Sequence, residues 1–264
     1  MNYEFICKNV ISAAQEAGLF IQSEARKFTS DKVEVKGLHN FVSYVDKKAE
    51  KILVEALTDI LPDAGFIAEE GTMEHHGEQL TWVIDPLDGT TNFIHGLPPY
   101  AISIALMDGN EIVLGVVYEL NTKECFYAWK GSDAFLDGKP ITVSNAAKVK
   151  DSLIATGFPY YDFDLMPAYL KSLEYFLKNS HGARRMGSAS VDLAYVACGR
   201  FEAFYEYSLQ PWDVAAGAFI LQQAGGKVSD FSGGNNFIFG KEIVATNGHI
   251  FEEFLGVIQT FLKQ

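Results

Sequence analysis

The first sixty residues carry the apolar pattern of two amphipathic helices. Over residues 3–28, apolar side chains recur every three or four positions, as at Val10, Ala13 and Ala17. A second stripe covers residues 46–61 and is followed by Pro62, which a helix interior does not accommodate. Because this spacing gathers apolar residues on one face, the sequence predicts a helix over each range.

Apolar runs of strand length complete the first half of the chain. They occupy residues 66–68, 82–84, 100–107, 111–119 and 124–129. Polar segments at 108–110 and 121–123 separate the last three runs and are typical of tight turns. The pattern predicts an antiparallel meander after two helices, which indicates an α+β or layered α/β protein.

In the second half, predicted strands and helices alternate. We expect strands over 153–156, 201–205, 227–229 and 243–245, and helices over 167–177, 190–197, 213–223 and 250–262. A soft boundary near residues 145–151 contains no flexible linker. We therefore expect an N-terminal unit, 1–148, and a C-terminal unit, 149–264, that share an interface within one compact body.

The composition and net charge of the chain argue against several classes of protein and of binding partner. The 264 residues are 48% hydrophobic, enough for a sizeable core, and no run approaches the ~20 apolar residues of a membrane helix. The N-terminus does not resemble a secretory signal, and three widely spaced cysteines indicate reduced thiols, so we expect a cytoplasmic protein. A net charge of −13 argues against direct binding to nucleic acid or to anionic membranes.

Acidic residues directly follow three of the apolar runs. They are Glu69 with Glu70, Asp85 with Asp88, and Asp213 after Trp212. Carboxylates at the ends of buried strands are costly unless something compensates their charge, and hard divalent cations do so with oxygen ligands. A helix capped by Asp88 is the alternative interpretation of the middle pair.

Residues 85–93, with the sequence Asp-Pro-Leu-Asp-Gly-Thr-Thr-Asn-Phe, form the most informative stretch. Pro86 favours an extended Asp85, so that Asp85 and Asp88 can point into one site. Gly89 permits close approach of a ligand, and the amides of Gly89 and Thr90 could bind a phosphate. The hydroxyl of Thr90 could orient a water molecule.

These segments resemble the signatures of the inositol monophosphatase family, in the same order and over nearly the whole chain. The matching residues are Glu69-Glu70 after a strand, the 82–93 segment that begins with Trp-Val-Ile, Trp-Asp-Val-Ala-Ala-Gly at 212–217, and Ala-Gly-Gly at 224–226. Ala68 departs from the glycine that the family usually has there. The resemblance implies a layered αβαβα sandwich of the sugar-phosphatase type, with an antiparallel sheet in the N-terminal half and a mixed sheet in the C-terminal half.

The resemblance also implies two or three Mg²⁺ ions, for which Mn²⁺ could substitute. Glu69, Asp85 and the carbonyl of Leu87 would bind the first ion, and Asp85, Asp88 and Asp213 the second. Oxygen ligands without His or Cys favour these metals over zinc.

A third, weaker ion would lie near Glu69 and, through water, Asp46, which could also be an N-cap. Glu69 and Thr90 would be the catalytic residues that orient and activate water, and lithium would inhibit by replacing one magnesium.

Substrate contacts follow from the same resemblance. The loop before the 190–197 helix would contact a polyol through Gly187, Ser188 and Ala189, and Glu206 would reach a ring hydroxyl or else be a solvated strand end. Asp88, Gly89, Thr90 and Asp213 would contact the phosphate or the leaving group. Arg184 could meet a partner subunit, a ligand or only solvent.

The expected reaction is hydrolysis of myo-inositol monophosphate or a similar polyol or sugar phosphate by a homodimer. Alternatives with the same site are fructose-1,6-bisphosphatase, histidinol-phosphatase and nucleotide 3′-phosphatase activities. A binding protein associated with transcription is the alternative from another class, because some bacterial relatives act in that way. The physiological substrate, the occupancy of the third metal site and the dimer interface do not follow from the sequence.

Overall fold

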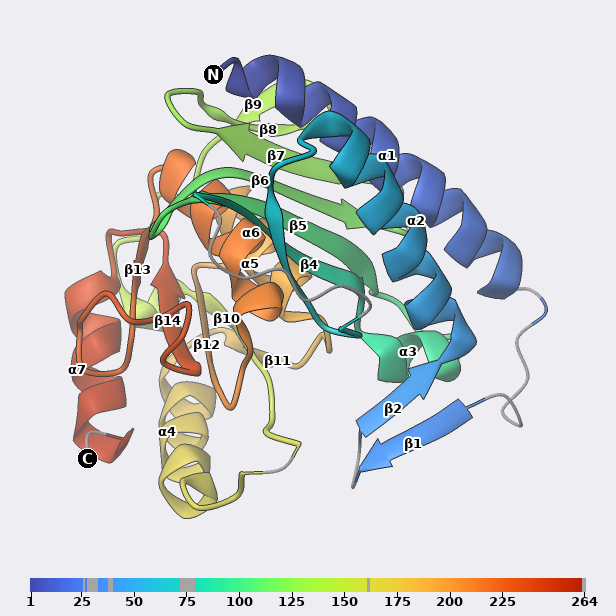
Figure 1. Cartoon of the computed structure of the whole chain (residues 1–264). Helices are drawn as coiled ribbons and strands as arrows, with labels where there is room; N and C mark the ends of the chain where they lie inside the picture. Colours follow the sequence, from blue (N-terminus) through green and yellow to red (C-terminus); the bar gives the residue numbers. More distant parts are fainter. Residues whose placement is uncertain (26, 28–32, 38–39, 72–78, 161, 263–264) are drawn as a thin grey trace.

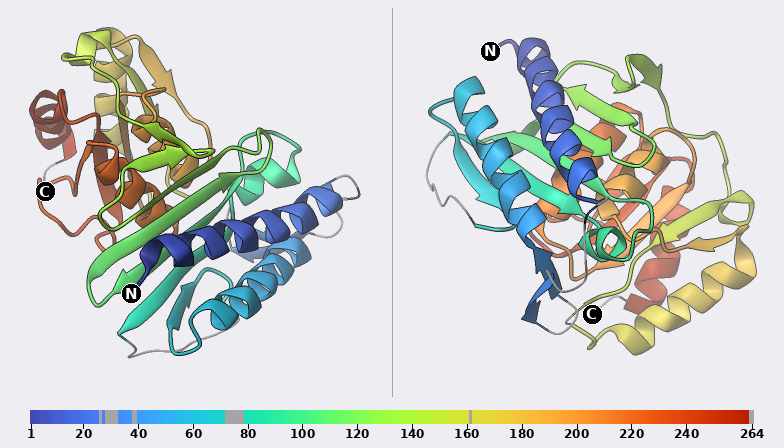
Figure 2. Two further views of the ribbon diagram at one scale, coloured as in Figure 1. Left: turned by 90° about the horizontal axis from the view of Figure 1, so that it is seen from above. Right: turned by 90° about the vertical axis from the view of Figure 1, so that its right-hand side faces the viewer.

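The computed structural model of the chain describes residues 1–25, 27, 33–37, 40–71, 79–160 and 162–262, with the backbone alone at 33–37 and 40–43. Among these residues, five layers follow one another in the order helix, sheet, helix, sheet, helix (Figures 1 and 2). The αβαβα sandwich implied by the family resemblance is therefore confirmed.

The outermost layer consists of α1 (Tyr3–Ala25) and α2 (Tyr44–Ile60), which lie side by side across one face of the larger sheet (Figure 2). Their apolar stripes, including Val10, Ala17 and Leu53, are fully buried against that sheet. Both helices are confirmed with shifted ends: α1 stops at Ala25 and residue 27 lies in a turn, while α2 runs over Tyr44–Ile60 instead of 46–61. Residues 26 and 28 lie outside the described part of the chain. A separate hairpin, β1 (Val33–Gly37) with β2 (Asn40–Ser43), precedes α2.

The larger sheet has seven strands in sequential order. They are β3 (Gly65–Ala68), β4 (Leu80–Asp88), β5 (Ala101–Asp108), β6 (Glu111–Glu119), β7 (Cys125–Trp129), β8 (Ala134–Leu136) and β9 (Lys139–Ile141). The neighbouring strands are antiparallel as expected, except β3 and β4, which run parallel, so the sheet is mixed. A short apolar run such as 66–68 fixes a strand but not its direction.

The smaller sheet has five strands in the order β11-β10-β12-β14-β13 and is mixed, as predicted. Its strands are β10 (Leu153–Thr156), β11 (Gly182–Arg184), β12 (Ala203–Tyr207), β13 (Lys227–Ser229) and β14 (Glu242–Thr246). Helices α5 (Ala189–Ala197) and α6 (Pro211–Gln223) lie between the two sheets, and α4 (Met166–Asn179) and α7 (Phe251–Leu262) cover the far face. Because α5 and α6 are covered on both sides, they are apolar almost all round.

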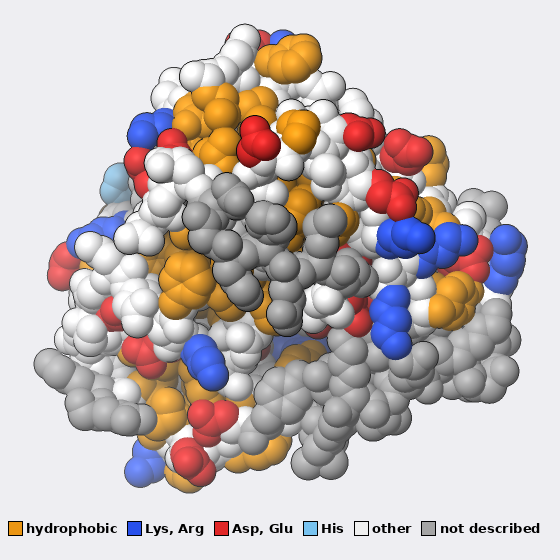
Figure 3. All heavy atoms as spheres, in the orientation of Figure 1, with side chains coloured by type: hydrophobic (Ala, Val, Ile, Leu, Met, Phe, Trp, Pro, Cys, Tyr) orange, Lys and Arg blue, Asp and Glu red, His pale blue; other side chains and the backbone are white. Residues whose placement is uncertain are grey.

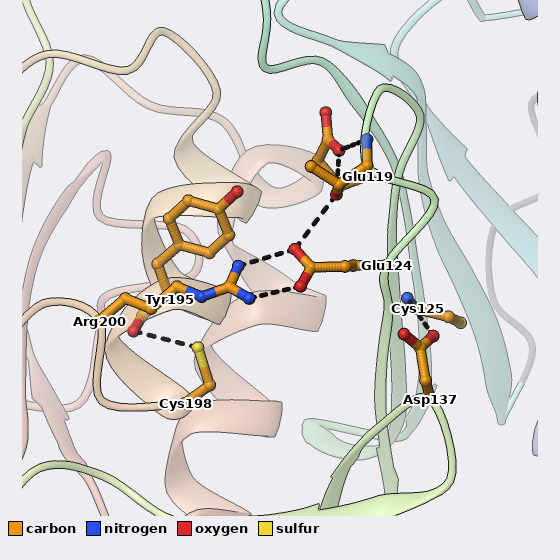
Figure 4. Close-up of polar contacts among 8 residues, drawn as sticks. Glu119, Glu124, Cys125, Asp137, Tyr195, Cys198 and Arg200 are labelled. Carbon is orange, nitrogen blue, oxygen red and sulfur yellow. Dashed lines mark hydrogen bonds and ion pairs between the residues drawn. The ribbon is translucent and has the colours of Figure 1, made fainter.

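One ion pair joins the end of α5 to the larger sheet (Figure 4). Arg200 donates two hydrogen bonds to the carboxylate of Glu124, one of them 2.7 Å long. Its guanidinium also lies 4.5 Å from the centre of the Tyr195 ring. The arginine lowers the pKa of Glu124, so the pair remains charged well into the acidic range.

The surface resembles that of an ordinary globular protein. On the face shown in Figure 3, acidic and basic side chains are interspersed. None of the helices in the described ranges combines the length and the apolar character needed to cross a lipid bilayer.

Candidate active site

A cavity of about 480 Å³ opens where the two sheets and the central helices meet. Its walls come from segments far apart in sequence: the ends of β3, β4, β10 and β12, the loop before α5, and the start of α6. All four acids expected to bind metal line it, namely Glu69, Asp85, Asp88 and Asp213. We call these four residues the acidic wall.

The register of the larger sheet brings the first two acids together. The parallel pairing of Ala68 with Ile84 places Glu69 beside Asp85, one residue further along each strand. Burial raises the pKa of Glu69 well above its usual value, the charge of Asp213 raises it further, and the neighbouring Asp85 side chain opposes this rise. The strand was predicted to end at Ile84, but β4 continues to Asp88.

An irregularity in β4 turns Asp85 and Asp88 into the same cavity. Asp85 pairs with Ser103 and Asp88 with Ala101, so β4 has two residues between them where β5 has one. The amide of Leu87 donates to Asp85 Oδ1 over 2.9 Å, which fixes that carboxylate on the bulge. Asp88 is not the N-cap of the following helix, because α3 (Thr90–Ile94) begins after Gly89.

Asp213 reaches the cavity from the first turn of α6. Its Oδ2 accepts a 2.7 Å hydrogen bond from the amide of Gln210, as one half of a capping box. One carboxylate oxygen each of Asp85, Asp88 and Asp213 lie within 4.8 Å of one another. This oxygen-only set fits a hard divalent cation such as Mg²⁺ or Mn²⁺.

Burial and mutual repulsion dominate the electrostatics of the acidic wall. Burial raises the pKa of Asp85 well above its usual value, and the charges of Glu69 and Asp88 raise it further. Burial and the Asp88 charge likewise raise the pKa of Asp213. Four carboxyl groups that resist ionisation together need a compensating positive charge, which a bound cation supplies.

Asp88 differs because donors surround it. Its Oδ2 accepts hydrogen bonds from the hydroxyls of Ser188 (2.6 Å) and Ser190 (2.5 Å) and from the amide of Ser190 (2.8 Å). These donors oppose the burial that raises the pKa of Asp88. Ser190 was not among the predicted site residues, although it stands one position after the predicted loop residues.

Thr90 connects the motif to the second helix. Its hydroxyl lies 2.9 Å from both Asp46 Oδ1 and the carbonyl oxygen of Leu87. Asp46 is 1% exposed and stands behind Thr90, outside the cavity lining. Since α2 begins at Tyr44, Asp46 belongs to the first helical turn and is not its N-cap.

Gly89 and the loop before α5 are packed against each other. Gly89 has a φ of +93°, and a Cβ there would come within 3.1 Å of the carbonyl oxygens of Gly187 and Pro99. Asn92 closes the same contact, because its side-chain amide donates to Pro99 and to Met186, each over 2.8 Å. Gly187, Ser188 and Ala189, for which the resemblance predicts contacts with a substrate, line the cavity.

Glu206 projects from β12 into the cavity and is only 7% exposed, so it is not a solvated strand end. Burial raises its pKa to about 8, which Arg185 opposes and Asp88 reinforces. Arg184 is exposed, donates to the carbonyl of Ala183 and lies outside the lining. Its neighbour Arg185 lines the cavity instead and donates to the Tyr160 hydroxyl over 2.7 Å.

The lining residues for which the sequence predicts no role include Gly157, Arg185 and Asp192. Asp192 is the charged residue of the apolar helix α5, which was a readable signal. Burial raises its pKa well above the usual value. Nothing in the sequence around Gly157 distinguishes it from an ordinary loop glycine.

Comparisons with known proteins agree with this geometry. A model of the inositol monophosphatase family matches residues 2–262. The chain is 42% identical over 247 residues to the putative Nus factor SuhB of Neisseria meningitidis, covering 93% of this chain and 95% of that protein. It is 39% identical over 251 residues to an inositol-1-monophosphatase of Rhizobium meliloti, covering 95% and 94%.

Comparison with solved structures agrees with the sequence comparisons. The extragenic suppressor protein SuhB of Bartonella henselae superposes with a TM-score of 0.90 at 38% identity, covering 96% of this chain and 97% of that one. An IMPase of Thermotoga maritima superposes with a TM-score of 0.87 at 35% identity, covering 96% of each chain.

Proposed function

Because the chain belongs to the inositol monophosphatase family, we propose that it is a magnesium-dependent phosphatase acting on inositol monophosphate or a similar polyol or sugar phosphate. The observation that carries the proposal is the acidic wall itself. Acids from two strands and a helix converge on one cavity, and three of them offer oxygens within 4.8 Å. The names of several relatives support the same activity.

The acidic wall would hold the metal ions. Asp85, Asp88 and Asp213 supply one set of oxygens, and Glu69 with Asp85 and the Leu87 carbonyl supply the other. Bound Mg²⁺ would neutralise the phosphate, acidify water and stabilise the leaving alkoxide. Asp46 would contribute to a third site only from behind Thr90.

The remaining residues position the reactants. Glu69 and the Thr90 hydroxyl would orient the attacking water, since Thr90 is fixed between Asp46 and Leu87. The loop at Gly187, Ser188 and Ala189 would shape the substrate pocket beside Asp88. Glu206 would accept a hydrogen bond from a substrate hydroxyl. Phosphoryl transfer depends mainly on such positioning and on electrostatics.

The deciding experiment is a phosphate-release assay on the purified protein. Its substrates are inositol 1-phosphate, fructose 1,6-bisphosphate, histidinol phosphate and a 3′-phosphoadenosine nucleotide, each with Mg²⁺, Mn²⁺ or a chelator. We expect hydrolysis of inositol 1-phosphate that requires the metal and is inhibited by Li⁺. Metal-independent hydrolysis, or none with this substrate, would contradict the proposal. Sedimentation in the same buffer tests the expected homodimer.

A second function is favoured by the names of some relatives, which are Nus factors. A protein-binding function in transcription would not require catalysis. The Asp85→Asn variant separates the two, because it removes a metal ligand and leaves the outer surface unchanged. Retention of the same protein partners by this variant would support a binding function, and loss of them would not.

A further inference from the structure

The register of the smaller sheet places Gly157 directly beside Glu206. Strand β10 pairs in parallel with β12, with Thr156 opposite Tyr205, and the next residues along the two strands are Gly157 and Glu206. A Cβ on residue 157 would lie 2.0 Å from Glu206 Oε2 and 2.1 Å from Oε1. The carboxylate therefore occupies the space that any other residue at position 157 would fill.

Neither backbone can move away easily. The Tyr169 hydroxyl donates to the carbonyl of Gly157, and the Thr156 hydroxyl donates to the carbonyl of Tyr205 over 2.8 Å. On its other side, Glu206 pairs with Ile243 of β14. The contact is fixed on both sides, so a side chain at position 157 would displace the carboxylate rather than the strands.

The backbone conformation of Gly157 does not itself require glycine. Gly157 is not among the glycines with positive φ, which include Gly89 and Gly187. Alanine is therefore compatible with the chain geometry at this position. What excludes it is the carboxylate opposite.

Asp192 brings an unpaired hydrogen-bond acceptor to this part of the cavity. It lines the cavity, is 1% exposed, and its Oδ1 has no hydrogen-bond partner among the described residues. Buried polar atoms are normally paired, and an unpaired one calls for an explanation. A ligand rich in hydroxyl groups would bring donors to this side. We call Gly157, Asp192 and Glu206 the Glu206 wall.

We propose that Gly157 is a positioning residue that determines specificity: its missing side chain lets the Glu206 carboxylate stand in the cavity and receive the hydroxyl groups of a polyol phosphate. The inference rests on the proposed phosphatase function and names the part of the site that selects the alcohol. A phosphate ester whose alcohol carries no hydroxyl group should depend much less on residue 157.

The test compares inositol 1-phosphate with phenyl phosphate at saturating Mg²⁺. In Gly157→Ala, kcat/KM for inositol 1-phosphate should fall roughly ten- to hundredfold, mainly through KM, because the hydrogen bond between a substrate hydroxyl and the Glu206 carboxyl group is lost and leaves a buried polar group unpaired. The fall for phenyl phosphate should be much smaller. Gly256→Ala, on the exposed side of α7 where an added Cβ meets nothing, should keep the wild-type selectivity.

A double variant separates positioning from general damage to the fold. Glu206→Ala removes the carboxylate and makes room for the methyl group, so adding Gly157→Ala to it should cause no further loss. Thermal unfolding should likewise show a smaller destabilisation by Gly157→Ala in the Glu206→Ala background. These two results would support the proposal.

Two results would contradict the inference about Gly157 without contradicting the proposed phosphatase function. One is an equal loss of activity on both substrates in Gly157→Ala; the other is a Gly157→Ala effect as large in the Glu206→Ala background as in the wild type. Wild-type protein without Mg²⁺-dependent activity on inositol 1-phosphate would instead overturn the proposed function, so the two failures are distinguishable.

Discussion

The two walls of the cavity are built in opposite ways. On the acidic wall, backbone and hydroxyl donors fix individual carboxylates: the Leu87 amide on Asp85, Ser188 and Ser190 on Asp88, and the Gln210 amide on Asp213. On the Glu206 wall, the described residues donate no hydrogen bond to the Glu206 carboxylate, and Asp192 Oδ1 is unpaired.

This difference separates two kinds of recognition. A cation needs several oxygens held at fixed positions before it binds, and the hydrogen bonds to the acidic wall supply that order. A polyol brings its own donors, so the Glu206 wall can leave its acceptors unsatisfied until a ligand arrives. Variants of the first wall should alter the dependence on metal, and variants of the second should alter substrate selectivity and the pH dependence of stability.

The largest effect is expected for Asp85→Asn. The amide keeps the shape but loses the charge of the residue that the resemblance places between both metal ions. We expect Mg²⁺-dependent kcat/KM to fall by at least roughly 10³-fold, because charge neutralisation at the phosphate is the main catalytic contribution. Phosphate release over a Mg²⁺ titration measures it. Asp63→Asn, at an exposed acid, is the matched control, and equal losses in both variants would contradict the assignment.

Glu206→Gln should change the pH dependence of the free energy of unfolding. Because burial raises the pKa of Glu206 from 4.5 to about 8, the folded protein retains a proton that the unfolded chain releases between these values. The free energy of unfolding therefore falls as pH rises through this window. Glutamine does not ionise, so the variant should gain stability relative to wild type between pH 5 and pH 9, by a few kcal/mol at about 1.4 kcal/mol per pKa unit.

Urea unfolding in chelator at the two pH values measures this gain. The charge of Glu206 also raises the pKa values of Asp192 and Asp213, so the variant relieves these two groups as well. Glu16→Gln on the exposed side of α1 controls for the loss of one charge. A stability difference that does not change with pH would show that Glu206 is not the buried titrating group.

A smaller effect is expected for Ser190→Ala. The substitution removes one of three donors to Asp88 Oδ2 and leaves the Ser188 hydroxyl and the backbone amide. Loss of such a supporting contact typically weakens metal binding by roughly tenfold or more. The Mg²⁺ concentration for half-maximal activity and the Mg²⁺-induced rise in melting temperature should both shift. Ser12→Ala, on the exposed face of α1, should shift neither.

The sequence predicts the acidic wall far better than the Glu206 wall. The acids follow apolar runs and stand in a long, distinctive motif, so the sequence alone identifies Asp85, Asp88 and Asp213. Gly157 and Glu206 become neighbours only through the parallel pairing of β10 with β12. No local pattern encodes a contact across 49 positions, and a glycine in a loop looks the same whatever lies opposite.

The same limit explains the errors in the fold. Helices α1 and α2 and strands β5 to β7 were predictable because periodicity and turns are local signals. The parallel pairing of β3 with β4, the continuation of β4 to Asp88, and the one-turn helix α3 depend on tertiary contacts. The bulge in β4 in particular arises from pairing with β5 rather than from residue preference.

The smallest effect should come from the far end of α5, whose N-terminal end carries Ser190 and Asp192. Arg200→Gln would remove the paired hydrogen bonds to Glu124 and the contact with the Tyr195 ring (Figure 4). Both partners are partly exposed, so we expect a loss of about 1 kcal/mol in the free energy of unfolding. Because the arginine lowers the pKa of Glu124, this contribution is present above the ordinary value of 4.5 and is lost as pH falls through the lower, folded value.

Urea unfolding at pH 7 and pH 3 measures the change, and Glu124→Gln with the double variant isolates the pair from the packing of the arginine stem. Neither kcat/KM nor the selectivity between inositol 1-phosphate and phenyl phosphate should change, since Arg200 lies outside the cavity lining. A change in selectivity would show that the position of α5 is transmitted to the Glu206 wall. The difference between the two walls would then depend on the position of α5 between the sheets as well as on the residues that line the cavity.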